Sequence, residues 1–127
     1  MAFSFWMLLV AGLLPYITVG FAKFSARGYD NHHPRQWAAG LQGRQARAYA
    51  AHQNHFEFFP FFAAAVIIAE LRTGGSSSVN LLAMTAIGAR IAYTAFYLTD
   101  RAILRSICWL IGMLCIIALF GAAAAGK

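Results

Sequence analysis

The sequence predicts an all-α membrane protein, a bundle of four transmembrane helices, from its composition and the lengths of its apolar segments. Hydrophobic residues make up 61% of the chain and charged residues 11%, whereas soluble domains carry about 25% charged residues. Four apolar segments follow one another at 3–22, 43–71, 79–98 and 103–125. Each is long enough to cross a ~30 Å hydrocarbon core, which takes about 20 helical residues. The 127 residues suffice for one domain, 1–127.

The first two segments differ in how they begin. No positive charge precedes segment 3–22, as it would in a cleaved signal peptide, so we expect a retained helix that Pro15 kinks. A polar connection, 23–43, comes next and is either a solvated connector or a functional loop. Segment 43–71 would be about 42 Å long as a helix. Its polar first turns should therefore project beyond the membrane.

The net charge and the two cysteines narrow the possible partners, the membrane orientation and the role of the thiols. The formal charge of +6 is explained by cytoplasmic loops of a membrane protein, so we expect no nucleic-acid partner. The first and third loops and adjacent helix ends carry Lys23, Arg27, Arg35, Arg44, Arg47, Arg101 and Arg105. The other side has Arg72 and Lys127, so loops one and three should be cytoplasmic and both termini outside. Cys108 and Cys115 are expected to be small core residues.

Polar residues in the second and third segments form two helical stripes. Arg47, Ala50, Asn54 and Glu57 follow the spacing i, i+3, i+7, i+10, and Arg90, Tyr93 and Tyr97 follow i, i+3, i+7. The two stripes lie at comparable depth near the cytoplasmic side and can face each other. A charge in mid-membrane costs about 2.5 to 3.5 kcal/mol, so we expect both stripes to avoid lipid. They form either a structural Glu57–Arg90 ion pair or a polar ligand site.

Two neighbouring patterns are weaker signals. His52 and His55 are spaced as metal ligands can be, but they fall on a different edge from the stripe, and we expect no metal site. The aromatic run is expected to pack between helices or face lipid. Its members are Phe56, Phe58, Phe59, Phe61 and Phe62.

The stretches "RAYAAHQNHFEFFPFF" and "RIAYTAFY" resemble the MAPEG family, the membrane-associated proteins in eicosanoid and glutathione metabolism. The resemblance rests on N-x-x-E-x-x-P (Asn54, Glu57, Pro60) joined to R-x-x-Y-x-x-x-Y (Arg90, Tyr93, Tyr97). It covers the second and third segments, and the four-helix layout covers the whole chain. Microsomal glutathione transferases belong to this family, and the chain looks like a bacterial-type member of the inner membrane.

The resemblance implies a homotrimer that binds glutathione between subunits near the cytoplasmic side. By residue-by-residue comparison, the glutathione-binding positions are Arg47, Asn54, Glu57, Arg90, Tyr93 and Tyr97. Arg105 or Arg101 would stabilise the thiolate, and Tyr93 could donate a hydrogen bond to the sulfur. Two departures stand out: Ala50 replaces an arginine of eicosanoid-type members, and Arg105 is one position from the family's catalytic arginine.

Two functions from different classes follow. The first is a membrane-bound glutathione transferase or peroxidase-like enzyme that acts on apolar electrophiles or lipid hydroperoxides arriving from the bilayer. The second is a non-catalytic membrane scaffold or lipid-binding protein of the same fold, which Ala50 and the displaced arginine favour. A transporter is less favoured because the chain has no inverted repeat.

Overall fold

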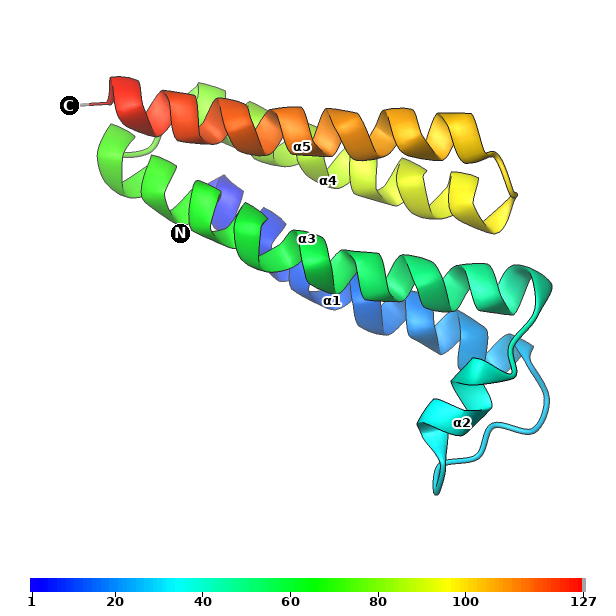
Figure 1. Cartoon of the computed structure of the whole chain (residues 1–127). Helices are drawn as coiled ribbons and strands as arrows, with labels where there is room; N and C mark the ends of the chain where they lie inside the picture. Colours follow the sequence, from blue (N-terminus) through cyan, green and yellow to red (C-terminus); the bar gives the residue numbers. More distant parts are fainter. Residues whose placement is uncertain (127) are drawn as a thin grey trace.

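The computed structural model describes residues 1–126, and the regular elements within this range are helices. They are α1 (Phe3–Ser25), α2 (Pro34–Ala39), α3 (Gly43–Thr73), α4 (Ser77–Leu98) and α5 (Ala102–Ala125). The four long helices run side by side along one axis, and α2 hangs from one end of the bundle (Figure 1). Lys127, which we assigned to the outer side, lies outside the described residues.

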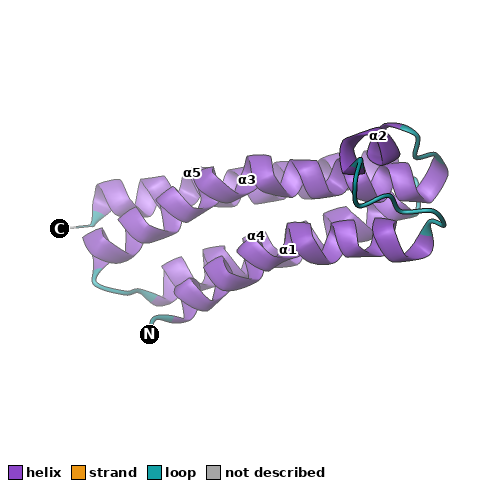
Figure 2. Cartoon of the chain, turned by 90° about the horizontal axis from the view of Figure 1, so that it is seen from below, coloured by secondary structure: helices purple, strands orange, loops and turns teal. Residues whose placement is uncertain are grey.

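The long helices pack as two antiparallel pairs. α1 packs on α3 and α4 on α5, while α3 also contacts α4 and α5 (Figures 1 and 2). Small side chains fill much of the core, which allows helices to approach closely in a membrane. The core alanines are Ala11, Ala65, Ala69, Ala83, Ala86 and Ala123. Arginines of α3 bind the C-terminal carbonyl groups of its neighbours: Arg47 donates to Leu98 O at 3.3 Å and Arg72 to Ala123 O at 3.4 Å.

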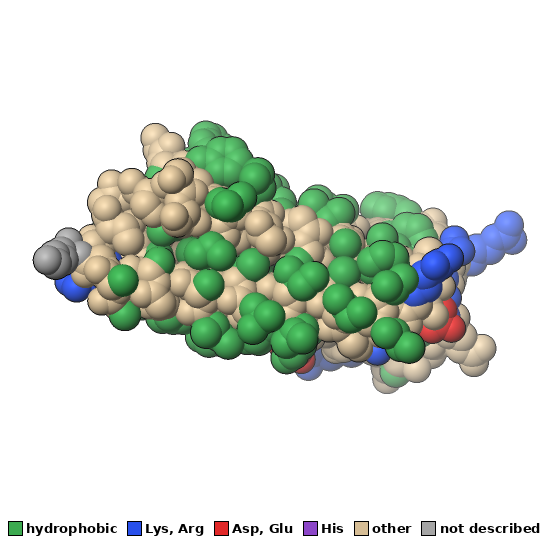
Figure 3. Space-filling model, turned by 90° about the horizontal axis from the view of Figure 1, so that it is seen from above, with side chains coloured by type: hydrophobic (Ala, Val, Ile, Leu, Met, Phe, Trp, Pro, Cys, Tyr) green, Lys and Arg blue, Asp and Glu red, His purple; other side chains and the backbone are tan. Residues whose placement is uncertain are grey.

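Three of the four predicted spans have the length and apolarity of membrane helices: α1, α4 and α5. α3 is long enough, but the polar residues of its N-terminal half lower its apolarity. Hydrophobic side chains are spread along the length of the bundle, and Lys and Arg side chains gather mainly toward its ends (Figure 3). The length and composition of these three helices therefore support an integral membrane protein, and the crossing by α3 stays a prediction.

The connections show two differences from expectation. The polar connection 23–43 was expected to lack regular structure, but it contains α2, which is too short to give a periodic hydrophobic pattern. The third long helix was expected at 79–98, but it begins two residues earlier, at Ser77, because Ser76 caps it by accepting the backbone N–H of Val79 at 3.2 Å.

Candidate functional site

Arg90 lies at the centre of the polar contacts between α3 and α4, with 0% of its surface exposed. Its guanidinium donates from Nη2 to Asn54 Oδ1 at 2.9 Å and from Nε to His55 Nδ1 at 3.3 Å. The Cζ atom lies 4.7 Å from the ring centre of Phe58 and 4.2 Å from that of Tyr93. The predicted facing of the two stripes is therefore present, and cation–π contacts support the buried charge.

His55 and Thr94 complete the support of Arg90. An arginine can only donate, so His55 Nδ1 accepts and its Nε2–H donates to Thr94 Oγ1 at 2.8 Å. The Thr94 hydroxyl donates in turn to Arg90 O at 3.0 Å. Sequence reasoning weighed His55 only as a metal ligand and missed Thr94. The available signal was the position of Thr94, one helical turn after Arg90 and so on the same face.

Glu57 does not join Arg90 in the bundle interior. Its side chain is exposed, and Asn54 Nδ2 donates to Glu57 Oε2 at 3.1 Å. Asn54 therefore lies between the two charges, with its oxygen toward the arginine and its nitrogen toward the carboxylate. The predicted alternative of a direct Glu57–Arg90 ion pair is therefore wrong. The cause is that one asparagine satisfies both groups and leaves the carboxylate on the surface of α3.

A polar cavity of about 240 Å³ opens beside this network, between α4 and α5. Its lining consists of Tyr93, Tyr97, Arg105, Ser106 and Trp109. Tyr93 is only 5% exposed and meets Tyr97 edge-to-face with 5.6 Å between ring centres. Arg105 Cζ lies 4.3 Å from the Tyr97 ring centre. Ser106 and Trp109 were not predicted, although both lie within about one helical turn of Arg105.

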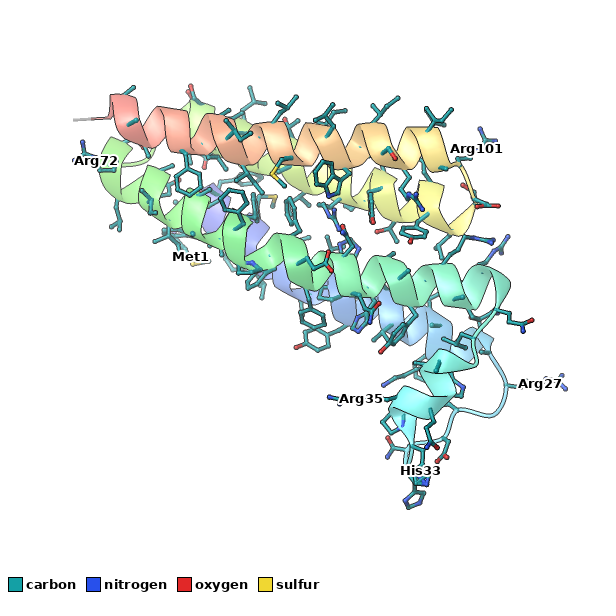
Figure 4. All side chains as sticks on the ribbon, in the orientation of Figure 1. Met1, Arg27, His33, Arg35, Arg72 and Arg101 are labelled. Atoms are coloured by element: carbon teal, nitrogen blue, oxygen red, sulfur yellow. The ribbon has the colours of Figure 1, made fainter. Side chains whose placement is uncertain are left out.

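The structure separates the two candidate arginines of α5. Arg105 lines the cavity, whereas Arg101 is exposed at the N-cap of the helix and extends from the end of the bundle (Figure 4). Arg47 of α3 lies against the last turn of α4, at the same end of the bundle as the cavity. Its Nε atom is buried and has no hydrogen-bond partner within the described part of the chain, residues 1–126. Arg105 is thus the better-placed cation for chemistry in this cavity.

The two histidines of α3 serve separate contacts. His52 Nδ1 lies 2.7 Å from Pro15 O and must donate to it, because a carbonyl oxygen only accepts. His55 is occupied by Arg90 and Thr94, as described above. Within residues 1–126, no three His, Cys, Asp or Glu side chains are grouped as metal ligands.

Comparison with known protein families decides the assignment of the chain. The sequence profile of the MAPEG family matches residues 3–125, which is nearly the whole chain. The chain belongs to the MAPEG family. A comparison with curated proteins finds no match. MAPEG membership agrees with the three apolar helices and supports a membrane protein of the glutathione-transferase or eicosanoid type.

Proposed function

We propose that the protein is a membrane-bound glutathione transferase or peroxidase-like enzyme. The observation that carries the proposal is a continuous line of contacts from the Arg105 cavity to an exposed carboxylate. The line runs through Tyr97, Tyr93, Arg90, Asn54 and Glu57. A site with cations at one end and a carboxylate at the other fits a zwitterionic ligand.

The residues present fit the charges of glutathione. The tripeptide has two carboxylates and one ammonium, and arginine forks are well matched to carboxylates. Arg47 is half-buried beside the last turn of α4, and its guanidinium offers such a fork. Glu57 is exposed and suits the ammonium. Asn54 orients Glu57 through the 3.1 Å hydrogen bond.

The cavity residues suit activation of a thiol. Bound glutathione would supply a thiolate that forms a carbon–sulfur bond with an apolar electrophile as the electrophile's leaving group, such as a halide, departs. With a lipid hydroperoxide, two glutathione thiols would be oxidised to the disulfide while the hydroperoxide is reduced to the alcohol and water. Arg105 stabilises negative charge on the sulfur, because a nearby cation lowers the pKa of a thiol. Tyr97 is half-buried and reaches the cavity more readily than Tyr93, so its hydroxyl is the better hydrogen-bond donor. Arg101 is too exposed at the helix end to share this role.

Arg90 acts through its neighbours in this proposal. It has no exposed surface, so it positions Asn54 and Tyr93 without touching the ligand. Among residues 1–126, its buried Nη1 atom has no hydrogen-bond partner. An unpaired buried donor is costly, which supports a role for Arg90 beyond joining two helices.

A second copy of the chain is needed to enclose the ligand. Pockets usually bury about 70–90% of a small ligand, yet Glu57 is exposed and the cavity opens on the outside of the chain. We therefore place the site between subunits of a homotrimer. Adjacent copies would meet through different faces, as in a closed ring.

In the membrane, α3 is proposed as a fourth crossing helix whose polar half faces this intersubunit site. Loops one and three are then cytoplasmic and both termini lie outside, because most Lys and Arg residues are at the end of the bundle that carries these two loops. The membrane we propose is a bacterial inner membrane. Lipophilic substrates would reach the site from the bilayer.

A scaffold or lipid-binding function is the second candidate. It is favoured by the ring of hydrogen bonds from Arg90 to His55, from His55 to Thr94 and from Thr94 back to Arg90 O, which joins α3 to α4. Calorimetry in detergent separates the two. The wild type should bind glutathione, Glu57→Gln should bind it more weakly, and an aryl halide should be conjugated. No heat of binding at millimolar glutathione would refute the transferase. Cross-linking should give trimers, and a clean monomer would remove the intersubunit site.

A further inference from the structure

A second cavity, of about 250 Å³, lies on the other side of the molecule under α2. α2 projects sideways from the end of the α1–α3 pair (Figure 1). The cavity is enclosed by α1, α3 and the connection between them. Its lining consists of Tyr16, Val19, Lys23, Tyr29, Pro34, Arg35, Trp37, Tyr49, His52 and Phe56.

The polar end of this cavity is positively charged. Lys23 belongs to the last turn of α1, and its Nζ lies 4.7 Å from the Tyr29 ring centre. Tyr29 in turn packs edge-to-face on Trp37, with 4.8 Å between the ring centres. The side chains that line the cavity include two cations, Lys23 and Arg35, and no Asp or Glu. The nearby Asp30 carboxylate is outside the lining and accepts the backbone N–H of His32 at 2.9 Å. An anion from outside the chain therefore fits beside these cations.

The other end of the cavity is apolar. Tyr16 and Phe56 meet edge-to-face with 5.6 Å between ring centres, and both are exposed on the bundle surface. Tyr16 precedes Lys23 by seven residues, which is about 10.5 Å along a helix. The cavity therefore passes from cations at the helix end to aromatic rings nearer the membrane core. Tyrosine and tryptophan at this depth are typical of the membrane–water interface.

The direction of the Arg35 side chain favours a lipid over a soluble anion as the ligand of this cavity. Its side chain points from α2 back along the bundle, toward the end that carries Met1 and Arg72, whereas Arg27 points away from the bundle (Figure 4). In a membrane, the Arg35 side chain thus points from the loop side toward the bilayer surface. We propose that this cavity binds an anionic bilayer lipid, with Lys23 and Arg35 on its phosphate and Tyr16 and Phe56 against its first acyl carbons.

The test is native mass spectrometry of the full-length protein titrated with dioleoyl phosphatidylglycerol. Lys23→Gln/Arg35→Gln is compared with Arg27→Gln/Arg44→Gln, which removes the same charge from the same end but outside the cavity. A cation near an anionic lipid contributes about five-fold to binding. The first pair should weaken retention about 25-fold, and the second pair, whose side chains lie outside the cavity, should weaken it clearly less. Unchanged circular dichroism verifies the fold of both.

Three outcomes would overturn the proposal. Equal losses in both double variants would mean diffuse attraction to the charged end. Binding of glycerol 3-phosphate as tight as that of the lipid would mean that the aromatic end contributes nothing. Lost glutathione binding in Lys23→Gln/Arg35→Gln, with lipid retention unchanged, would assign the cavity to the thiol site of an adjoining copy. The inference is independent of the transferase proposal, because lipid retention is measured without glutathione.

Discussion

The two ends of α3 both place polar side chains against the bundle core. At the C-terminal end, Glu70 is 8% exposed and accepts a hydrogen bond from the Ser4 hydroxyl. The backbone N–H of Ser4 donates to Asn80 Oδ1 at 3.0 Å, so the two contacts tie α1 to α3 and α4. Arg72 completes this end by donating to Gly126 O at 2.7 Å. Gly126 suits this contact because a Cβ there would lie 2.7 Å from Arg72 O.

The N-terminal half of α3 is arranged differently. Within residues 1–126, the buried side-chain nitrogen and oxygen atoms without a partner are Arg47 Nε and Arg90 Nη1, both at this end. An exposed carboxylate, Glu57, and the Arg105 cavity accompany them. Both ends of α3 thus contain buried polar groups. The end with the candidate site differs because two of its buried nitrogen atoms lack a hydrogen-bond partner, and we call it the unsatisfied end. The polar groups at the C-terminal end of α3, around Glu70 and Ser4, have hydrogen-bond partners and serve to connect the helices.

The largest expected effect is on Arg105, which belongs to the unsatisfied end. Arg105→Ala should lower kcat for conjugation of an aryl halide by about 10²- to 10³-fold, as loss of one charge-stabilising donor does elsewhere. Glutathione affinity should change much less, because we propose that other residues bind its carboxylates. Stopped-flow absorbance measures the rate. Arg101→Ala is the matched control, and an equal loss in that variant would contradict the assignment of the cavity.

Glu57 should come next in size. Glu57→Gln keeps the shape and the contact with Asn54 but removes the charge that is proposed to bind the glutathione ammonium. Hydrogen bonds to charged groups contribute about 1.5–3 kcal/mol, so the glutathione Kd should rise about ten- to hundredfold. Calorimetry measures the Kd, and thermal stability should stay that of the wild type. A variant that melts earlier yet binds normally would place Glu57 in a structural role.

Glu70 should behave in the opposite way, because its end of α3 is satisfied. Glu70→Ala removes the acceptor of the Ser4 hydroxyl and should lower the free energy of unfolding by about 1–3 kcal/mol. The glutathione Kd should stay unchanged. Glu70→Gln retains an acceptor and serves as the control. Denaturation in detergent gives the stability, and weaker glutathione binding by Glu70→Ala would remove the distinction between the two ends.

Much of this arrangement was predictable from the sequence, in particular the all-helical membrane fold and the interior position of Arg90. Both follow from the cost of exposing polar groups to lipid. The role of Asn54 was not predictable, because spacing places a side chain on a face but does not decide which of two charges it bonds. The choice of Arg105 over Arg101 depends on the turn before α5, where Asp100 adopts φ 59°. Helical periodicity does not encode that turn.

The Glu70 connection was missed for a related reason. Glu70, Ser4 and Asn80 are far apart in the sequence and come from three helices. No local pattern joins them, and only the packing of the helix ends brings them together. A carboxylate at the end of the apolar C-terminal half of α3 was the available signal, since such a group needs a partner when it is buried.

Thr94 offers the smallest effect and the finest test of the unsatisfied end. Thr94→Val preserves the shape but removes the acceptor of His55 Nε2–H, so the ring loses the contact that fixes Nδ1 toward Arg90. One neutral hydrogen bond contributes about 0.5–1.5 kcal/mol. The glutathione Kd should therefore rise about two- to tenfold if Arg90 positions Asn54 for the ligand. Thr85→Val is the control, since Thr85 bonds only Leu81 O within the same helix, at 2.8 Å. Equal affinities in the two variants would show that the Arg90 network joins helices without serving the site.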